Sequence, residues 1–353
     1  MLTSHGTQAH RTHVKGSGFR NEAERVDSGA GKLLQILWRY LTTRVVDKTP
    51  GKQIPVRRLR LPRQPSTEPA LYKISHSTLL LQLRGHYWLT DPVFAERASP
   101  SQWVGPKRFH SLPLELADIP PLAGIILSHD HYDHLDKHSI QALDARTGVF
   151  IVPLGVDRHL RAWGVAADKI IALDWWQDTT QQGVKFTATP AQHFSGRGLR
   201  DGNQTLWASW VIEAAPLKLF FSGDSGYFDG FKRIGDRLGP FDLTLIETGA
   251  YDELWADIHM LPEQSLRAHL DLRGRYLMPI HNSSFALALH SWYEPLQRLQ
   301  AAANAYDVPL LTPEFGQAIA LDKLEQSQAL DHGWWQRQLP AFAPEPVSIP
   351  ARA

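Results

Sequence analysis

The segment Ser128-His129-Asp130-His131-Tyr132-Asp133-His134 follows directly on the apolar run Gly124-Ile125-Ile126-Leu127. Four strong metal-binding side chains therefore fall within six positions of a turn that leaves a buried strand: His129, His131, Asp133 and His134. On such a turn alternate side chains can converge on one point, so the first two can hold one ion while the last two face a second. Without a metal, so many ionisable groups beside a buried strand would cost burial free energy, and a His-rich surface turn explains them poorly.

Three further potential ligands each lie just past a later apolar run. They are His193 after 184–189, Asp224 after 220–221, and His281 after 276–280. Open sheets place their sites at such strand ends. Taken singly, each has an ordinary explanation as a hydrogen-bonded surface histidine or a turn-forming aspartate. Their order behind the four-ligand motif favours one joint metal site.

The composition restricts the chemistry of that site. The chain has 353 residues, 43% of them hydrophobic, and no cysteine. Thiolate ligands and disulfides are therefore excluded, and any metal must be bound by histidine and carboxylate. The start of the chain is polar and lacks the apolar run of a signal peptide, and no stretch is apolar for long enough to span a bilayer. We expect a cytoplasmic protein that could associate peripherally with a membrane.

The net charge of +1 is unevenly distributed along the chain. Residues 1–63 contain thirteen lysines and arginines against four acidic residues, an excess of nine positive charges, which leaves −8 for the rest. A basic arm on an acidic body indicates an anionic partner, such as a membrane surface or a nucleic acid. A nuclease would need a basic groove around its site, so the acidic body argues against a nucleic-acid partner.

The basic arm is assigned to residues 1–69. Residues 1 to about 30 are polar and are predicted to be poorly ordered. Apolar residues recur near helical spacing within 31–46, with basic residues among them, which predicts an amphipathic helix. Two interpretations of this helix stay open: it docks on the body, or it lies in a membrane interface. Residues 48–69 are rich in Pro, Arg and Gln and are predicted to form a linker.

The catalytic domain is predicted to span residues 70–320, with a C-terminal extension and a loose tail at 321–353. Strand-like runs cover 79–83, 87–90, 123–128, 184–189, 206–212, 217–221, 243–246 and 276–280, and helical patterns cover 137–145, 263–270 and 291–303. Strands thus recur through the domain, with helices after the metal motif and in the C-terminal half. This pattern fits sheets covered by helices.

The order of the seven candidate ligands is similar to that of the metallo-β-lactamase superfamily. Over residues 72–316 the chain further resembles one family within it, the N-acylphosphatidylethanolamine-hydrolysing phospholipases D. The segments that carry this resemblance are Leu89–Phe94, Arg97–Gln102, Gly105–Phe109, Ser128–Asp136, Val152–Gly155, Leu173–Trp176, Gly239–Leu243, Gly249–Tyr251 and Ser284–Ala288. The metal motif is specific for the superfamily, whereas the second and third segments point to the family.

The resemblance implies an α/β fold, the αββα sandwich of the superfamily, in which two mixed sheets pack face to face with helices outside. It also implies two Zn²⁺ ions per chain. His129, His131 and His193 would bind one ion, Asp133, His134 and His281 would bind the other, and Asp224 would bridge them. The residue types agree, because neutral imidazoles with few carboxylates suit zinc better than magnesium or calcium.

The same resemblance implies hydrolysis of the phosphodiester in N-acylated ethanolamine phospholipids, with phosphatidic acid as a product. Two ions roughly 3.5–4 Å apart can share a hydroxide that is nucleophilic near neutral pH, and they can clamp a phosphoryl group. Catalytic roles then fall to Asp133 and Asp224, which bind the ions, and to His259 as a partner of the phosphate or the leaving group. His259 could instead be a plain helix-entry histidine.

Several positions depart from the family pattern near the site. The family usually has His-Trp-Gly-Thr-Phe around the last ligand, where this chain has His281-Asn282-Ser283-Ser284-Phe285. We therefore expect altered surroundings of the metal and altered substrate preference, rather than lost metal binding. The usual Gly-His before the second strand is Ser75-His76 here, and Leu261 stands where the family is usually acidic. Asp91 could orient a ligand histidine, or it could simply form a turn.

Rival functions remain open at this point. A hydrolase of the same fold that cleaves a lactone or another phosphodiester would use the same ligands, because the ions polarise carbonyl and phosphoryl oxygens alike. A non-enzymatic binding or scaffold protein would not need the full ligand set. The favoured interpretation is a phospholipid phosphodiesterase whose N-terminal arm contacts anionic membranes.

Overall fold

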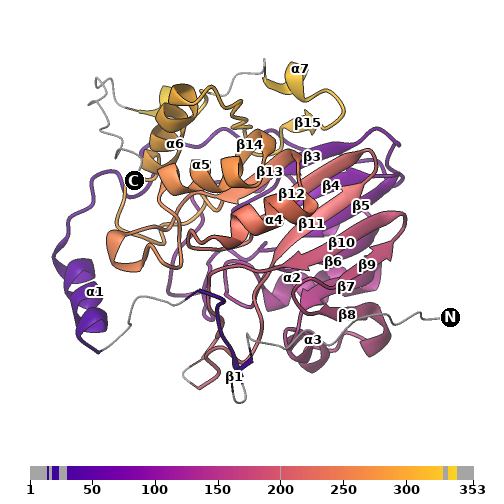
Figure 1. Ribbon diagram of the computed structural model, residues 1–353, viewed down its shortest axis with the longest axis horizontal. Coiled ribbons are helices and arrows are strands. Elements are labelled where there is room, and N and C mark those ends of the chain that lie inside the picture. The colour runs from indigo at the N-terminus through magenta and orange to yellow at the C-terminus, as the bar shows by residue number, and fades with distance from the viewer. Residues whose placement is uncertain (1–13, 16–17, 24–29, 199, 329–332, 340–353) are drawn as a thin grey trace.

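The computed structural model describes residues 14–15, 18–23, 30–198, 200–328 and 333–339. Two β-sheets pack face to face, and helices lie on their outer faces (Figure 1). This arrangement confirms the predicted αββα sandwich. The tail at 340–353 and residues 1–13 lie outside the described residues.

The first sheet has the strand order β15-β3-β4-β5-β6-β7-β8. Its strands are β15 (Ala318–Ala320), β3 (Ala70–Lys73), β4 (Leu79–Leu83), β5 (His86–Thr90), β6 (Leu122–Ile126), β7 (Thr147–Pro153) and β8 (Ile170–Leu173). Pairing is antiparallel from β15 to β5 and parallel from β5 to β8. The crossovers contain α2 (Lys137–Leu143) and α3 (Asp157–Ala162), whose buried Ile140 and Leu160 pack on the outer face of this sheet.

The second sheet has the order β14-β13-β12-β11-β10-β9. Its strands are β9 (Asp178–Gln181), β10 (Val184–Thr189), β11 (Ser209–Ala214), β12 (Leu217–Phe221), β13 (Phe241–Glu247) and β14 (Gly274–Ile280). The first four are antiparallel, and β12, β13 and β14 are parallel. Its outer face is covered by α4 (Gly230–Leu238), α5 (Pro262–Asp271) and α6 (Glu294–Ala305) (Figure 1).

Alternation along the strands separates the inner core from the outer ones. In β12, Leu219 and Phe221 belong to the core between the sheets, while Phe220 packs under the helices of the second sheet. In β4, Leu81 faces the same inner core and Leu80 faces the opposite layer. Successive strand residues point to opposite faces, so a strand covered on both faces appears as a continuous apolar run.

The N-terminal arm packs on this body. It contains the short strands β1 (Val14–Lys15) and β2 (Gly18–Phe19) and the helix α1 (Ala30–Thr42), which is shorter than the predicted 31–46. Arg39 Nη1 lies 2.9 Å from Asp252 Oδ1, and Ile36 packs beside the buried Trp255. The inner face of the helix is therefore docked, as one of the two interpretations expected. None of the described helices is long and apolar enough to cross a membrane.

Three segments are more closely packed than the sequence indicated. The linker carries Ile54, which is buried, and Arg57 N donates to Phe315 O at 2.8 Å. After α7 (Leu324–Gln328), Trp334 and Trp335 are buried in a cluster that includes Ile54. Residues 18–23, predicted to be poorly ordered, contact the body beside the candidate site described below. In each case a few apolar or amide side chains find partners far away in the chain, which local composition cannot reveal.

Candidate metal centre

The candidate ligands meet because their strands end at one edge of the sandwich. In the second sheet β10, β12 and β14 run in the same direction, so the residues that follow them, His193, Asp224 and His281, share that edge. In the first sheet β3, β5 and β6 also run in one direction, which brings the β3–β4 loop beside the motif that follows β6. Side chains as far apart in the chain as His76 and His281 therefore converge, as the carboxyl ends of aligned strands allow.

The first group of side chains is formed by His129, His131, His193 and Asp224. His131 Nδ1 lies 2.9 Å from His129 Nε2 and 3.2 Å from His193 Nε2. Asp224 Oδ2 lies 3.7 Å from the first of these Nε2 atoms and 3.8 Å from the second. Donors around a tetrahedral zinc ion lie about 3.4 Å apart, given Zn–N distances of about 2.1 Å. The observed separations bracket that value.

Hydrogen bonds on the far side of these rings decide which nitrogens carry lone pairs. His193 Nδ1 lies 2.9 Å from the carbonyl oxygen of Ile258, which can only accept, so Nδ1 carries the proton. His129 Nδ1 lies 2.9 Å from Ser128 Oγ, whose own proton goes to Asp91 Oδ2 at 2.6 Å. Both Nε2 atoms therefore present lone pairs to His131, whose neutral ring has one proton to donate. A cation satisfies all three nitrogens, whereas hydrogen bonds cannot.

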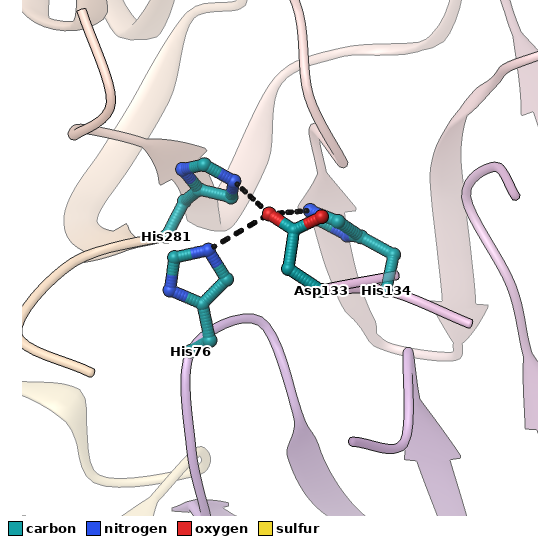
Figure 2. Close-up of side chains that lie close together, drawn as sticks. All are labelled: His76, Asp133, His134 and His281. Carbon is teal, nitrogen blue, oxygen red and sulfur yellow. Dashed lines mark hydrogen bonds and ion pairs between the residues drawn. The ribbon is translucent and has the colours of Figure 1, made fainter. Parts of the chain in front are cut away.

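The second group is formed by His76, Asp133, His134 and His281. Figure 2 shows the Asp133 carboxylate facing the three imidazoles. Asp133 Oδ2 lies 3.2 Å from Nε2 of His281, 3.4 Å from Nε2 of His76 and 3.6 Å from Nε2 of His134. All three histidines are buried, at 1% exposed or less. This group also matches a metal site of imidazoles and one carboxylate.

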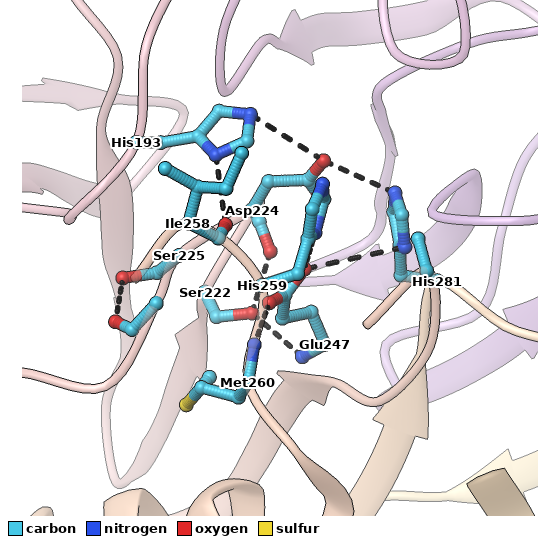
Figure 3. Close-up of polar contacts among 12 residues, drawn as sticks. His193, Ser222, Asp224, Ser225, Glu247, Ile258, His259, Met260 and His281 are labelled. Carbon is cyan, nitrogen blue, oxygen red and sulfur yellow. Dashed lines mark hydrogen bonds and ion pairs between the residues drawn. The ribbon is translucent and has the colours of Figure 1, made fainter. Parts of the chain in front are cut away.

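Asp224 lies between the two groups. Its Oδ1 is 3.0 Å from His134 Nε2, and its Oδ2 is 3.0 Å from His281 Nε2. Figure 3 shows His193 and His281 on either side of this carboxylate. Since the same Oδ2 also faces the first group, Asp224 has the geometry of a residue shared by two sites.

Charge in the centre is divided between buried carboxylates and the imidazoles around them. Burial alone would raise the pKa of Asp224, but His134 and His281 hold that pKa well below its ordinary value. Burial opposes protonation of His281, yet Asp224 and Asp133 raise its pKa to about 10. The carboxylates thus require positive partners, either protons on neighbouring imidazoles or metal ions that displace those protons. By contrast, burial lowers the pKa of His129 and His193, which leaves them neutral and able to bind a metal.

Asp91 supports both groups from behind. Its Oδ1 accepts a hydrogen bond from Ser128 N at 2.7 Å, and its Oδ2 lies 2.7 Å from His134 Nδ1. The carboxylate keeps the proton of His134 on Nδ1 and turns Nε2 toward the centre. Asp91 also has a positive φ of 35°, so it forms a turn as well. The structure therefore places Asp91 where the orienting interpretation requires.

His259 lies at the rim of the centre, paired with a carboxylate that sequence reasoning missed. His259 Nδ1 is 2.9 Å from Glu247 Oε2, and Glu247 Oε1 accepts from Met260 N at 2.8 Å (Figure 3). The His259 ring lies 5.1 Å from that of His193 and 5.3 Å from that of His281. Burial raises the pKa of Glu247, which is fully enclosed. Its place at the end of β13 was the available signal, because a carboxylate that closes an apolar strand faces the same edge as the ligands.

Asn21 connects the N-terminal arm to a candidate ligand. Its Oδ1 accepts from His193 N at 3.0 Å, and its Nδ2 donates to His193 O at 2.8 Å. Trp207 Nε1 donates to the same Oδ1 at 2.9 Å. The side-chain amide thus pairs with the backbone of His193 as a neighbouring strand would. No sequence signal marked this residue.

The altered residues after His281 have partners of their own. Lys73 Nζ donates to Asn282 Oδ1 at 2.9 Å, and both residues are buried. Ser284 Oγ lies 2.9 Å from His110 Nε2.

The structure brings all seven predicted ligands, Asp91 and His259 together in one place. Three residues of this place were not singled out from the sequence: His76, Glu247 and Asn21.

A large cavity of the molecule lies away from the two donor groups. This cavity of about 800 Å³ lies at the opposite edge of the sandwich, among Leu83, Leu217, Tyr276, Leu321 and other residues. Its described lining has basic and acidic side chains but no histidine. The candidate functional site lies at the converging donor atoms, because buried imidazoles and carboxylates that face one another can bind a metal and the described lining of this cavity has no such group.

Comparison with known proteins agrees with this geometry. Residues 86–282 match the beta-lactamase superfamily domain. An uncharacterized protein of Mycobacterium tuberculosis is 42% identical over 309 residues, which cover 86% of this chain and 82% of the relative. The N-acyl-phosphatidylethanolamine-hydrolyzing phospholipase D 1 of Caenorhabditis elegans is 34% identical over 261 residues, which cover 69% of this chain and 73% of that protein.

A solved structure supports the fold alone. The isothiocyanate hydrolase from Delia radicum gut bacteria superposes with a TM-score of 0.58 at 22% identity, over 71% of this chain and 98% of that one. At that identity the likeness extends to the sandwich and not to the substrate.

Proposed function

From its membership in the beta-lactamase superfamily and, within it, in the N-acylphosphatidylethanolamine-hydrolysing phospholipase D-like family, we propose a function for this chain. The protein is a dinuclear zinc phosphodiesterase that acts on N-acylated ethanolamine phospholipids. Water would add to phosphorus while the bond from phosphorus to the ethanolamine oxygen breaks. The products would be phosphatidic acid and an N-acylethanolamine. The observation that carries the proposal is the pair of donor groups joined by Asp224, with the His259–Glu247 pair at their rim.

The geometry supports the proposed ligand sets. His129, His131 and His193 would hold one ion, Asp133, His134 and His281 the other, and Asp224 would touch both. Two zinc ions held there would activate a water molecule near neutral pH and neutralise the phosphoryl oxygens. Asp91 keeps His134 oriented toward its ion, and the carbonyl of Ile258 does the same for His193.

His259 is the group proposed to manage the leaving group. The N–H at Nδ1 points to Glu247, so Nε2 is the atom that can hold a proton for the departing ethanolamine oxygen. Glu247 fixes this tautomer and stabilises the ring when it is protonated. Loss of that proton transfer costs typically about 10²–10⁴-fold in rate, which sets the scale for a His259→Ala variant.

Metal content and substrate choice test the proposal. Elemental analysis of the purified protein should give two zinc ions per chain, and the loaded protein should release an N-acylethanolamine from the corresponding phospholipid. A lactone panel and a cyclic dinucleotide belong in the same experiment. One ion at saturating zinc would contradict the dinuclear site, and turnover of a lactone or dinucleotide in place of the phospholipid would identify another hydrolase of this fold.

The outer face of α1 is proposed to contact the phospholipid surface. Leu34, Trp38 and Leu41 lie on one side of the helix and are 67%, 68% and 75% exposed, although all are large and apolar. Tyr40 Oη on the docked side donates to Leu287 O at 2.9 Å, near the loops that flank the centre. An apolar face beside basic residues is the pattern of interfacial helices. Basic residues add about 1 kcal/mol each near an anionic membrane.

Vesicle binding tests this membrane contact. A variant with Leu34, Trp38 and Leu41 all replaced by Ser should lose binding to anionic vesicles at low salt and keep its thermal stability. Leu270→Ser, which removes an exposed leucine on α5, is the matched control and should bind as the wild type does. If the triple variant still binds while its stability drops, the helix is structural and the membrane contact is wrong.

A further inference from the structure

His76 belongs to the second group of side chains, but it is not one of the seven ligands predicted from the sequence. It lies in the β3–β4 loop and is 1% exposed. Its ring lies 3.9 Å from that of His281 and 5.9 Å from that of His134 (Figure 2). Neither ring nitrogen has a hydrogen-bond partner in the structure. A buried imidazole left in this state loses the free energy of two hydrogen bonds to water.

Nearby groups cannot supply those partners without a cation. Asp133 Oδ2 faces the Nε2 atoms of His76 and His281 at 3.4 and 3.2 Å, and that of His134 at 3.6 Å. The proton of His134 lies on Nδ1, so its Nε2 turns a lone pair rather than a proton toward this oxygen. A cation between the carboxylate and the three imidazoles would satisfy all of these atoms. Water has little space, because the cavity that borders His76 holds about 10 Å³, near the lower limit for one molecule.

The backbone around His76 is fixed before any ligand binds. His281 N donates to His76 O at 3.1 Å, which ties the loop to a proposed metal ligand. Thr78 Oγ1 donates to Asp91 O at 2.7 Å, and Thr90 Oγ1 donates to Ser77 O at 2.8 Å. A loop held in this way presents its imidazole at a defined position, as a binding residue requires.

We propose that His76 Nε2 is a further ligand of the ion held by Asp133, His134 and His281. This inference rests on the proposed metal binding and adds a residue to it. With Asp224, that ion has five protein donors, whereas the ion at His129, His131 and His193 has four. An ion enclosed by protein is bound for structure, and an ion with fewer protein donors keeps a position for water or substrate. The first group, with fewer protein donors, therefore leaves more of its coordination shell to water or substrate than the second group does.

Cobalt substitution can count the imidazoles directly. In the protein loaded with two Co²⁺ ions, each bound imidazole gives a hyperfine-shifted N–H signal that disappears in D₂O. Six such signals are expected if His76 binds, and five if it does not. Five signals in the wild type would overturn the inference even if every variant failed to fold.

Variants provide an independent measurement. His76→Gln keeps the size and polarity of the side chain but removes the imidazole. It should lose one shifted signal and weaken the binding of one zinc ion by about 100-fold or more in competition with a chelator, since even residues beyond the ligands cost about 10–100-fold. His269→Gln is the matched control, because His269 is also 1% exposed and bonds Thr244 away from the centre.

The outcomes separate this inference from the proposed function. If His76→Gln binds zinc as tightly as the wild type and keeps all six signals, His76 is not a ligand. That outcome would leave the proposed dinuclear hydrolase intact. A wild type that binds no Co²⁺ or Zn²⁺ would contradict the proposed function itself.

Discussion

The two halves of the metal centre are supported in different ways. His129 and His193 are oriented by neutral partners, Ser128 Oγ and the carbonyl of Ile258, and the backbone of His193 pairs with Asn21 from the N-terminal arm. In the other half, the carboxylate of Asp91 orients His134, and the loop of His76 holds His281. The first half therefore depends on a distant segment of chain, and the second on the interior of the body.

Backbone strain is concentrated in the second half. His281 has a φ of +61° and Ser283 a φ of +58°, values that residues other than glycine rarely adopt. Such a conformation costs roughly 1–3 kcal/mol and persists only where the surroundings hold it. The bond from His281 N to His76 O is one such restraint. We therefore expect changes in the second half to lower the stability of the body more than changes in the first half do.

Asp224→Ala should have the largest effect because this carboxylate touches both halves. We expect turnover to fall by more than about 100-fold and both ions to bind more weakly. Loss of a residue that only hydrogen-bonds to a ligand costs about 10–100-fold, and loss of a ligand itself should cost more. Asp224→Asn, which keeps the shape, should lose nearly as much because the amide lacks the charge. Near-wild-type turnover in either variant would show that Asp224 does not bridge the halves.

Asp91→Asn should damage the half that contains His134 more than the half that contains His129, which Asp91 reaches only through Ser128. The amide nitrogen would replace Asp91 Oδ2 opposite His134 Nδ1, so two N–H donors would face each other and the hydrogen bond would be lost. We expect about 10–100-fold weaker binding of one zinc ion, with a loss of about 1–3 kcal/mol in the free energy of unfolding. Asp242→Asn is the control, because Asp242 Oδ2 accepts from Lys218 N at the far edge of the sandwich. Equal weakening of both ions would contradict the division into halves.

Asn21→Ala should loosen only the other half. Removing the amide takes two hydrogen bonds from the His193 backbone, so we expect about 10-fold weaker binding of one zinc ion. Glu22 is the residue after Asn21, and it forms an ion pair with Arg233. Glu22→Gln removes that ion pair and should leave the affinity for both zinc ions unchanged. Titration of the metal-free protein with zinc and a competing chelator measures this, and an affinity equal to that of the wild type would rule out the support by the arm.

Lys73→Met should leave both ions bound and change only the pH dependence of stability. Burial lowers the pKa of Lys73 from 10.5 to about 7, so between these values the unfolded chain binds more protons than the folded one. Stability of the wild type should therefore rise with pH across this window. From pH 7 to 9 the rise attributable to Lys73 is about 2 kcal/mol. Urea unfolding of metal-free wild type and variant at both pH values gives the difference, and parallel pH profiles would contradict it.

Regular elements were predictable where the pattern was local. The runs 79–83, 184–189 and 217–221 are strands β4, β10 and β12 as predicted, because each is a short apolar stretch bounded by turn residues. The run 206–212 was misplaced, since β11 begins at Ser209. Leu206 N instead donates to Leu154 O and Ala208 N to Ser128 O, so the apolar start of the run pairs with loops rather than with a strand.

The sequence by itself determined the kind of candidate site and most of the side chains that meet there. Histidines and aspartates directly after apolar runs, in a chain without cysteine, restrict the chemistry to a metal bound by imidazole and carboxylate. Local spacing determines these features, because a strand end and the turn after it are read from adjacent residues. The amphipathic pattern of α1 was determined in the same way.

Only the tertiary structure decided which other residues complete the centre. His76 and His281 lie at the ends of β3 and β14, in different sheets, and they meet only because the sheets pack face to face with these ends at one edge. Glu247 and Asn21 likewise gain their roles from partners that are 12 and 172 residues away. A buried histidine has the same local sequence signal whether it faces a metal centre, like His76, or a threonine hydroxyl, like His269. The difference arises from three-dimensional packing, because the donors that surround a side chain are set by the register and direction of distant strands.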